Sequence, residues 1–354
     1  MAKKITPTHD EGHEITEKKL AELERRLAAE YRVAQAEIAE KLNDYMMRFE
    51  TKDLRKKDQV ARGVITEAEY QQWRKGQLIV GQRWEDLRHD VAVRFHETNG
   101  AAKALSAESA AAIYAENMNF GAYIVEKTAR IETGFVLANE KSIVRLVRDD
   151  PKLFPAPGRK LRRRVAEGKD VLWNRRQVQS LALQAIIQGE SIPKIASRIV
   201  TELGEKNYRS AVRTARTMIT GAQNGGRLDA FRELSAEGVK MKKMWIATLD
   251  MRTRHSHAAL DGAMVDVDEP FNNGLMNPGD AGGDPAEVYN CRCTMIAKIN
   301  GIGRDLSGRD AKKLDGLSYD EWKAGKYKQQ AKDIEGQTEA GILARYAYIA
   351  EYRR

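Results

Sequence analysis

The sequence predicts a mainly α-helical N-terminal region followed by a small α+β domain, in which antiparallel strands surround a His/Cys motif. Early in the chain, apolar residues recur at steps of three and four, the spacing of a helix with one buried face. Both cysteines and two of the six histidines instead fall within residues 245–294. The same segment holds the glycine-rich run 274–283 between two stretches of strand-like pattern. The reactive residue types are therefore concentrated in the second part.

The composition predicts a globular protein of two or three domains. With 354 residues, 42% hydrophobic and 31% charged, the chain can bury a core and falls outside the disordered class. Two cysteines one residue apart cannot form a disulfide framework for a fold of this size. The absence of such a framework favours a reducing compartment. The first residues carry no apolar run, and no uncharged stretch approaches the roughly 18 residues of a membrane helix. We therefore expect a soluble protein without a signal peptide.

Residues 1–150 are predicted to form long helices that act in assembly or docking. An apolar stripe between Leu20 and Phe49 predicts a helix of about thirty residues, with Thr16 as its N-cap. The Thr66–Glu69 segment has the capping-box pattern and predicts a second helix start. A third, alanine-rich helix is expected from Ser106 to Tyr114. The apolar faces either pack against each other as a bundle or form a surface for a partner chain.

Residues 151–175 are predicted to be a basic, proline-rich linker, because three prolines fall between positions 151 and 157. From residue 151 to 243 there are 20 Lys and Arg residues against 8 Asp and Glu, a net charge of +12, whereas the rest of the chain sums to −3. Such a block either solvates helices or faces a polyanion. The residues proposed to contact nucleic acid are Arg159, Lys160, Arg162, Arg163, Arg164, Arg209, Arg213 and Arg216.

Residues 176–302 are predicted to form the α+β domain with its leading helices. The pattern indicates helices from Arg176 to Gly189, from Ser191 to near Gly204 and from Asn207 to Glu237, and then a strand from Met241 to Leu249. Residues 303–354 are expected to be a helical tail that includes a helix from Glu339 to Tyr352.

The residues around the cysteines include side chains that bind zinc. A predicted strand from Val288 to Ile299 would place Cys291 and Cys293 on one face, with Cα atoms about 6.6 Å apart, which is poor geometry for a disulfide. His257 is the best third ligand, and His255 or Asp250 would be a fourth. Three interpretations stay open: a zinc site, a metal-free network of hydrogen bonds, and a catalytic site.

The order of these residues is similar to a known family motif. The string Trp-x₄-Asp-x-Arg-Thr-Arg-x-Ser-His-x₂-Leu-Asp-Gly, followed by Asn-Cys-Arg-Cys-Thr, resembles the phage Mu F-like head morphogenesis domain. The resemblance covers about residues 191–323, including an Ala-Arg-Thr helix in which Met218 replaces the family's glutamate and a capped helix at 318–323. The matching positions are Asp250, Arg252, Thr253, His257, Asp261, Gly262, Cys291, Arg292 and Cys293.

The resemblance implies a minor capsid protein of a tailed phage, not a metabolic enzyme. Proteins of this kind are present in few copies per particle, near the portal vertex inside the capsid. They pass through the host cytoplasm during assembly. The implied partners are the portal protein, other capsid or scaffold proteins and, without sequence preference, phage DNA. The family comes with no agreed reaction, so the expectation is no catalytic residue and no certain cofactor beyond the zinc candidate.

Two other functions fit the sequence. One is a nuclease-like or toxin-type enzyme that uses His257, Asp261, Cys291 and Cys293. The other is a DNA-binding adaptor with no capsid role and no catalysis.

Overall fold

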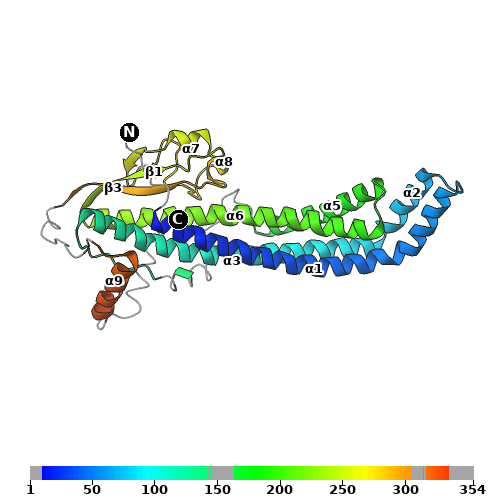
Figure 1. The fold of residues 1–354 in the computed structure, drawn as a ribbon, viewed down its shortest axis with the longest axis horizontal. Coiled ribbons are helices and arrows are strands. Elements are labelled where there is room, and N and C mark those ends of the chain that lie inside the picture. The colour runs from blue at the N-terminus through cyan, green and yellow to red at the C-terminus, as the bar shows by residue number, and fades with distance from the viewer. Residues whose placement is uncertain are drawn as a thin grey trace. The chain divides into compact units, whose positions relative to one another are not determined.

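The computed structural model describes residues 10–139, 141, 143–144, 163–303, 314 and 316–334. Its helices and strands, in chain order, are α1 (Glu11–Ala61), α2 (Glu67–Leu78), α3 (Gln82–Ala129), α5 (Arg163–Ile187), α6 (Ile192–Ala236), β1 (Val239–Ile246), α7 (His255–Ala259), β2 (Met264–Asp266), α8 (Pro285–Val288), β3 (Thr294–Ile302) and α9 (Tyr319–Ile334) (Figure 1). The predicted fold class is confirmed: long helices precede a small domain with three antiparallel strands.

The chain divides into two compact units. Unit 1 comprises residues 1–23, 104–158 and 213–354, and unit 2 comprises residues 24–103 and 159–212. The helices α1, α3 and α6 each contribute residues to both units. The division of the sequence at residues 150, 175 and 302 stays a prediction.

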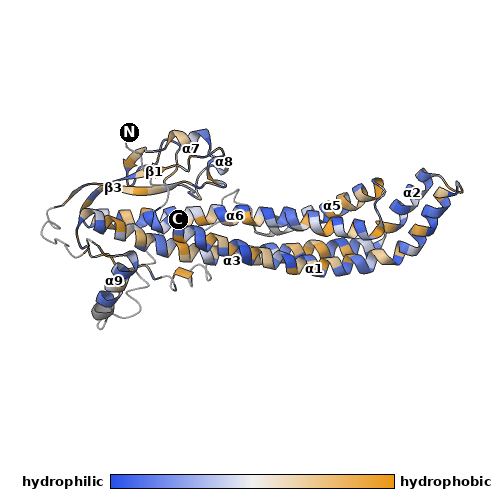
Figure 2. Cartoon of the chain, in the orientation of Figure 1, coloured by the Kyte–Doolittle hydropathy of each residue, from blue (hydrophilic) through white to orange (hydrophobic). Residues whose placement is uncertain are grey.

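Unit 2 is built from helices, and its core confirms the predicted apolar stripe. On α1, buried side chains recur at steps of three and four: Leu27, Tyr31, Ala34, Ile38, Leu42 and Tyr45. Figure 2 shows the same alternation of apolar and polar residues along the long helices, as expected when each helix buries one face. The predicted capping box is also present, since the Thr66 side chain accepts from Glu69 N and Glu69 accepts from Thr66 N. None of the described helices is long and apolar enough to cross a membrane.

Two predicted helix ends are wrong. The first helix begins at Glu11, where Asp10 Oδ1 accepts a hydrogen bond from His13 N at 2.8 Å. Thr16 is therefore not an N-cap; it is buried inside α1 and its hydroxyl donates to the Gly12 carbonyl. Gly204 does not end a helix either, because α6 runs unbroken over 45 residues. A Cβ at Gly204 would lie 2.0 Å from Gln35 Nε2, so this glycine allows a close contact with α1.

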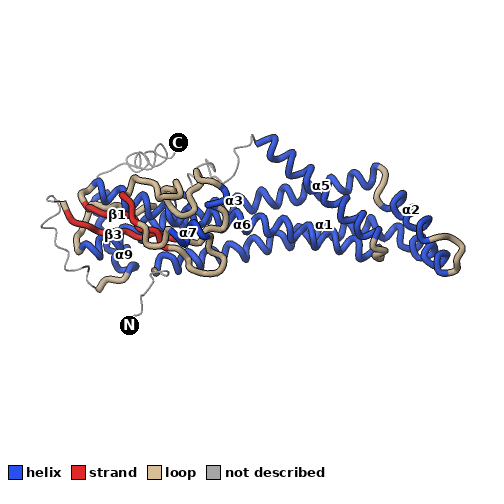
Figure 3. Tube along the Cα trace, turned by 90° about the horizontal axis from the view of Figure 1, so that it is seen from above, coloured by secondary structure: helices blue, strands red, loops and turns tan. Residues whose placement is uncertain are grey.

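The sheet of unit 1 has the order β2-β1-β3, with both pairs antiparallel. In Figure 3, β1 and β3 run side by side over their whole length. Trp245 pairs with Met295 and Ile246 with Thr294, so the end of β1 lies beside the start of β3. This register brings the chain after β1 close to the segment that holds the cysteines.

Arg227 on α6 joins the sheet to the helices of unit 1. The side chain is 2% exposed, and its guanidinium donates to both carboxylate oxygens of Asp10 at 2.6 and 2.7 Å. It also donates to Asn117 Oδ1 on α3 at 3.1 Å and to the Met295 carbonyl on β3 at 3.1 Å. Burial raises the pKa of Asp10, but the charge and hydrogen bonds of Arg227 outweigh it and leave that pKa below its usual value.

The structure also confirms the capped helix that the sequence predicts at residues 318–323. The Ser318 hydroxyl accepts from Glu321 N at 3.3 Å and Glu321 accepts from Ser318 N at 2.8 Å, which confirms the predicted capped helix, α9. The predicted helix at residues 339–352 lies outside the described residues.

Candidate metal site

His257 and the two cysteines come together in unit 1. His257 lies on the short helix α7 and is 2% exposed. Its Nδ1 lies 3.6 Å from Cys291 Sγ and 3.5 Å from Cys293 Sγ. One ligand atom from each of the three residues falls within 4.8 Å of the others, so the group can hold a metal ion. The Trp245 and His257 rings lie nearly perpendicular to each other, with ring centres 5.2 Å apart.

The cysteines do not lie on a strand, which corrects the sequence prediction. The segment starts as the short helix α8, which Asp284 caps through Ala286 N and Pro285 opens. Asn290 then adopts a left-handed conformation with φ of 54°, and β3 begins only at Thr294. Both cysteines therefore sit in an irregular loop, where their thiols turn toward one histidine.

Polar side chains of α6 hold this loop. Thr220 Oγ1 donates to the Cys291 carbonyl at 2.8 Å, and Asn224 Nδ2 donates to the Cys293 carbonyl at 3.1 Å. Asn224 Oδ1 accepts from Met295 N at 3.1 Å, which fixes the start of β3. The sequence analysis did not predict that these side chains hold the loop. The signal was present, because the spacing of Thr217, Thr220 and Asn224 places three polar residues on one face of a helix.

Glu287 is a further polar neighbour that sequence reasoning missed. Its Oε2 lies 3.0 Å from Nε2 of His257, although the angle is not that of a directed hydrogen bond. Ser256 Oγ donates to the same carboxylate at 3.0 Å from Oε2 and 3.2 Å from Oε1. The two nitrogens of His257 thus face different partners: sulfur on one side and a carboxylate on the other.

The two thiols differ in acidity. A hydrogen bond from Cys291 and the neighbouring His257 lower the pKa of Cys293 to about 5, although burial opposes them. The same contact with Cys293 and burial raise the pKa of Cys291 well above its usual value. Cys293 is therefore the more acidic of the two thiols and Cys291 the less acidic.

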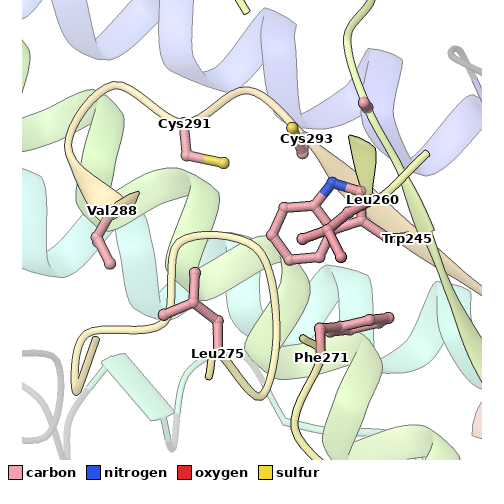
Figure 4. Close-up of a cluster of buried hydrophobic side chains, with 8 residues drawn as sticks. Trp245, Leu260, Phe271, Leu275, Val288, Cys291 and Cys293 are labelled. Carbon is pink, nitrogen blue, oxygen red and sulfur yellow. The ribbon is translucent and has the colours of Figure 1, made fainter. Parts of the chain in front are cut away.

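An apolar shell encloses the cluster (Figure 4). Its buried members are Trp245, Ala247, Leu260, Phe271, Leu275 and Val288. Cys291 and Cys293 are 2% and 3% exposed, so bulk solvent and a macromolecular substrate have little access to the thiols. The arrangement suits metal binding or a structural network better than nucleophilic catalysis.

The exposed part of the motif forms a separate ion-paired turn. Asp250 accepts two hydrogen bonds from Arg292 at 2.5 and 2.7 Å, one from Arg252 N at 2.9 Å and one from Thr253 Oγ1 at 3.1 Å. The Arg292 hydrogen bonds hold the pKa of Asp250 well below its usual range. His255 is exposed and lies outside the cluster. The prediction of Asp250 or His255 as a fourth zinc ligand is therefore wrong.

Asp261 and Gly262 hold the chain just after β1. Asp261 Oδ1 accepts from Ala247 N at 2.9 Å, and Gly262 N donates to the Trp245 carbonyl at 2.9 Å. Gly262 has a φ of 78°, which other residues rarely adopt. Neither residue lies in the His/Cys cluster. Their role in the motif is to hold the backbone after β1 through these hydrogen bonds.

The proposed nucleic-acid residues are only partly described. Arg159, Lys160 and Arg162 lie outside the described residues, as do the side chains of Arg163 and Arg164. On α6, Arg209 pairs with Glu205 at 2.8 Å, Arg213 lies over the Tyr289 ring, and Arg216 is exposed. Contact of these arginines with DNA stays a prediction.

Comparison with known proteins gives a family match and two named relatives. The family model described as Phage Mu protein F like protein matches residues 176–296. Minor head protein GP7 of Bacillus phage SPP1 is 31% identical over 223 residues, which cover 60% of this chain and 69% of that protein. NAD(+)–arginine ADP-ribosyltransferase EFV of Enterococcus faecalis is 33% identical over 211 residues, which cover 58% of this chain and 42% of that protein. No solved structure gives a significant match.

One sequence prediction is corrected by these findings. We predicted that the chain is not an enzyme, but a relative that is named for an enzymatic activity shares a third of the aligned residues. The prediction followed from the family resemblance, which came with no agreed reaction. The chain spans less than half of that relative, at 42% of its length.

Proposed function

Because this chain belongs to the Phage Mu protein F-like family of minor head proteins, we propose that it is a minor capsid component of a tailed phage. It is present in few copies at the portal vertex, contacts the portal and the packaged DNA, and assists head assembly or DNA delivery. The observation that carries this proposal is the similarity to a minor head protein over 69% of that protein's length. The place of action is the virion.

The portal contact is assigned to the helices before residue 151, and co-purification of the full chain tests whether the contact with the portal exists. Co-expression of the full chain with the portal protein of the same phage should give a portal ring that carries the chain through size-exclusion chromatography. A deletion of residues 1–150 is not a suitable variant, because it removes Asp10 and Asn117, which bind the buried Arg227. A ring that consistently elutes without the chain would contradict the portal assignment.

The basic block supports contact with DNA. Each Lys or Arg that neutralises a phosphate contributes roughly 0.9 to the slope of log K against log salt. Changing Arg162, Arg163 and Arg164 to Ala should flatten that slope by about 2–3 if each contacts a phosphate. The matched control changes the exposed α1 residues Arg25, Arg26 and Arg32 to Ala and should leave the slope unchanged. Equal slopes in both variants would show that the block only solvates the surface.

The Enterococcus faecalis relative favours a second candidate function, transfer of ADP-ribose from NAD⁺ to arginine. The chain spans 42% of that protein, so the match by itself does not assign the activity to the shared segment. Incubation of the purified chain with labelled NAD⁺ and an arginine-containing acceptor distinguishes the candidates. Transfer of label would establish the enzyme, whereas no transfer by folded protein would count against it.

A further inference from the structure

Two sulfur atoms converge on one nitrogen lone pair in the His/Cys cluster. If His257 Nε2 carries the proton, Nδ1 is an acceptor and can receive only one S–H hydrogen bond. Cys291 Sγ and Cys293 Sγ nevertheless lie at nearly equal distances from it, 3.6 and 3.5 Å. A metal-free account needs two separate hydrogen bonds, one from a thiol to His257 and one between Cys291 and Cys293. A cation between the three atoms explains both N–S distances.

The distances are those of a tetrahedral zinc site. Zinc binds cysteine sulfur at about 2.3 Å and histidine nitrogen at about 2.0–2.1 Å, which places N and S about 3.6 Å apart when the angle is tetrahedral. The two observed N–S distances, 3.5 and 3.6 Å, match this value. The ligand set, two cysteines and one histidine, is also a recognised zinc combination.

Glu287 and Ser256 supply the outer contacts of such a site. A histidine that binds metal through one nitrogen almost always gives its other N–H to a carboxylate, carbonyl or water. Glu287 Oε2 lies 3.0 Å from His257 Nε2, and Ser256 Oγ donates to the same oxygen at 3.0 Å. The charge of the nearby carboxylate favours a proton on Nε2, although Nε2 makes no hydrogen bond among the described residues, and so leaves Nδ1 of His257 free to bind metal.

We propose that His257 Nδ1, Cys291 Sγ and Cys293 Sγ bind one Zn²⁺ ion, with Glu287 as a positioning residue. The ion would tie α7 to the loop before β3 and so anchor the end of the 274–283 glycine run. The described His, Cys, Asp and Glu residues supply three ligands, and water can complete a site of this kind. The proposal goes beyond the head role and does not depend on it.

Metal analysis of the purified full chain tests the proposal. We expect about one zinc per chain in protein prepared without a metal-affinity step. Cys291→Ser, Cys293→Ser and His257→Ala should each remove most of it. His255→Ala is the matched control, because this exposed histidine lies on the same helix and outside the cluster, and it should keep the metal.

Cobalt binding by the unmutated chain keeps the test valid if a variant fails to fold. Adding Co²⁺ to metal-free protein with reduced thiols should produce the thiolate-to-cobalt absorption and the visible bands of a tetrahedral site. Glu287→Gln should keep these bands and weaken zinc affinity by about 10- to 100-fold in a chelator competition. Metal-free folded protein that shows no cobalt bands, or a Cys291–Cys293 disulfide in freshly purified protein, would overturn the proposal.

Discussion

Replacing Arg227 with methionine is expected to lower the free energy of unfolding by about 3–5 kcal/mol. The guanidinium is 2% exposed and is the donor for both oxygens of Asp10 and for the Met295 carbonyl. Methionine can fill part of the volume but donates no hydrogen bond, so the partly buried carboxylate keeps only the His13 N donor and the Met295 carbonyl loses the Arg227 donor. Urea unfolding measures the change. Arg209→Met is the control on the same helix, and the loss of its exposed pair with Glu205 should cost at most about 1 kcal/mol.

The ion pair between Arg227 and Asp10 also makes the free energy of unfolding depend on pH. The pKa of Asp10 is lowered in the folded chain, so the unfolded chain binds a proton at a higher pH than the folded chain does. The stabilisation is therefore fully present above the pKa of an unfolded aspartate, and it is lost as the pH falls through the lower folded pKa. Arg227→Met should remove this part of the acid sensitivity. An Arg227→Met protein as stable as the control at neutral pH would contradict this role for the arginine.

Gly226→Ala is expected to destabilise the chain by about 3 kcal/mol, because the methyl group has no room. A Cβ at this position would lie 2.3 Å from the Tyr114 carbonyl oxygen and 3.0 Å from Met118 N on α3. Both atoms belong to a helix backbone, so a change of side-chain rotamer cannot relieve the contact. The helices α3 and α6 must separate locally, which weakens the packing of unit 1.

Gly100→Ala provides the opposite control. Gly100 lies within α3, and a Cβ there would meet no atom within 4 Å. Alanine loses less entropy in a helix than glycine, so this variant should be more stable by about 0.5–1 kcal/mol. Thermal melts of both variants test whether the melting temperature falls for Gly226→Ala and rises for Gly100→Ala. Stabilisation by Gly226→Ala would show that the close helix contact is wrong.

The helical part of the fold was largely predictable because it depends on local patterns. The stripe that begins near Leu20 and the Thr66 cap are read from residues three or four positions apart. The ends of the elements were less predictable. Threonine is a common N-cap residue, but the hydroxyl of Thr16 donates to a carbonyl inside α1. Glycine often ends a helix, but Gly204 lies inside α6, where its missing side chain leaves room for Gln35. A hydrogen bond within the helix places Thr16, and a contact with another helix places Gly204.

The candidate site was predictable in its inner residues and not in its outer ones. His257, Cys291 and Cys293 were predicted together because few residue types bind soft metals. Glu287 lies 30 positions after His257, and its partner could not be inferred before α8 was placed. Asp250 was misassigned as a ligand because its residue type fits zinc, whereas in the fold the adjacent Arg292 holds it in an exposed turn.

The composition of purified phage particles tests the central claim most directly. Particles made by the phage genome that encodes this chain should be banded on a density gradient and quantified by mass spectrometry against the portal protein. We expect peptides from the whole chain, at a number of copies similar to or below that of the portal subunit and far below that of the major capsid protein. If the chain is expressed in the same infected cells but absent from particles and from assembling heads, it is not a minor head protein.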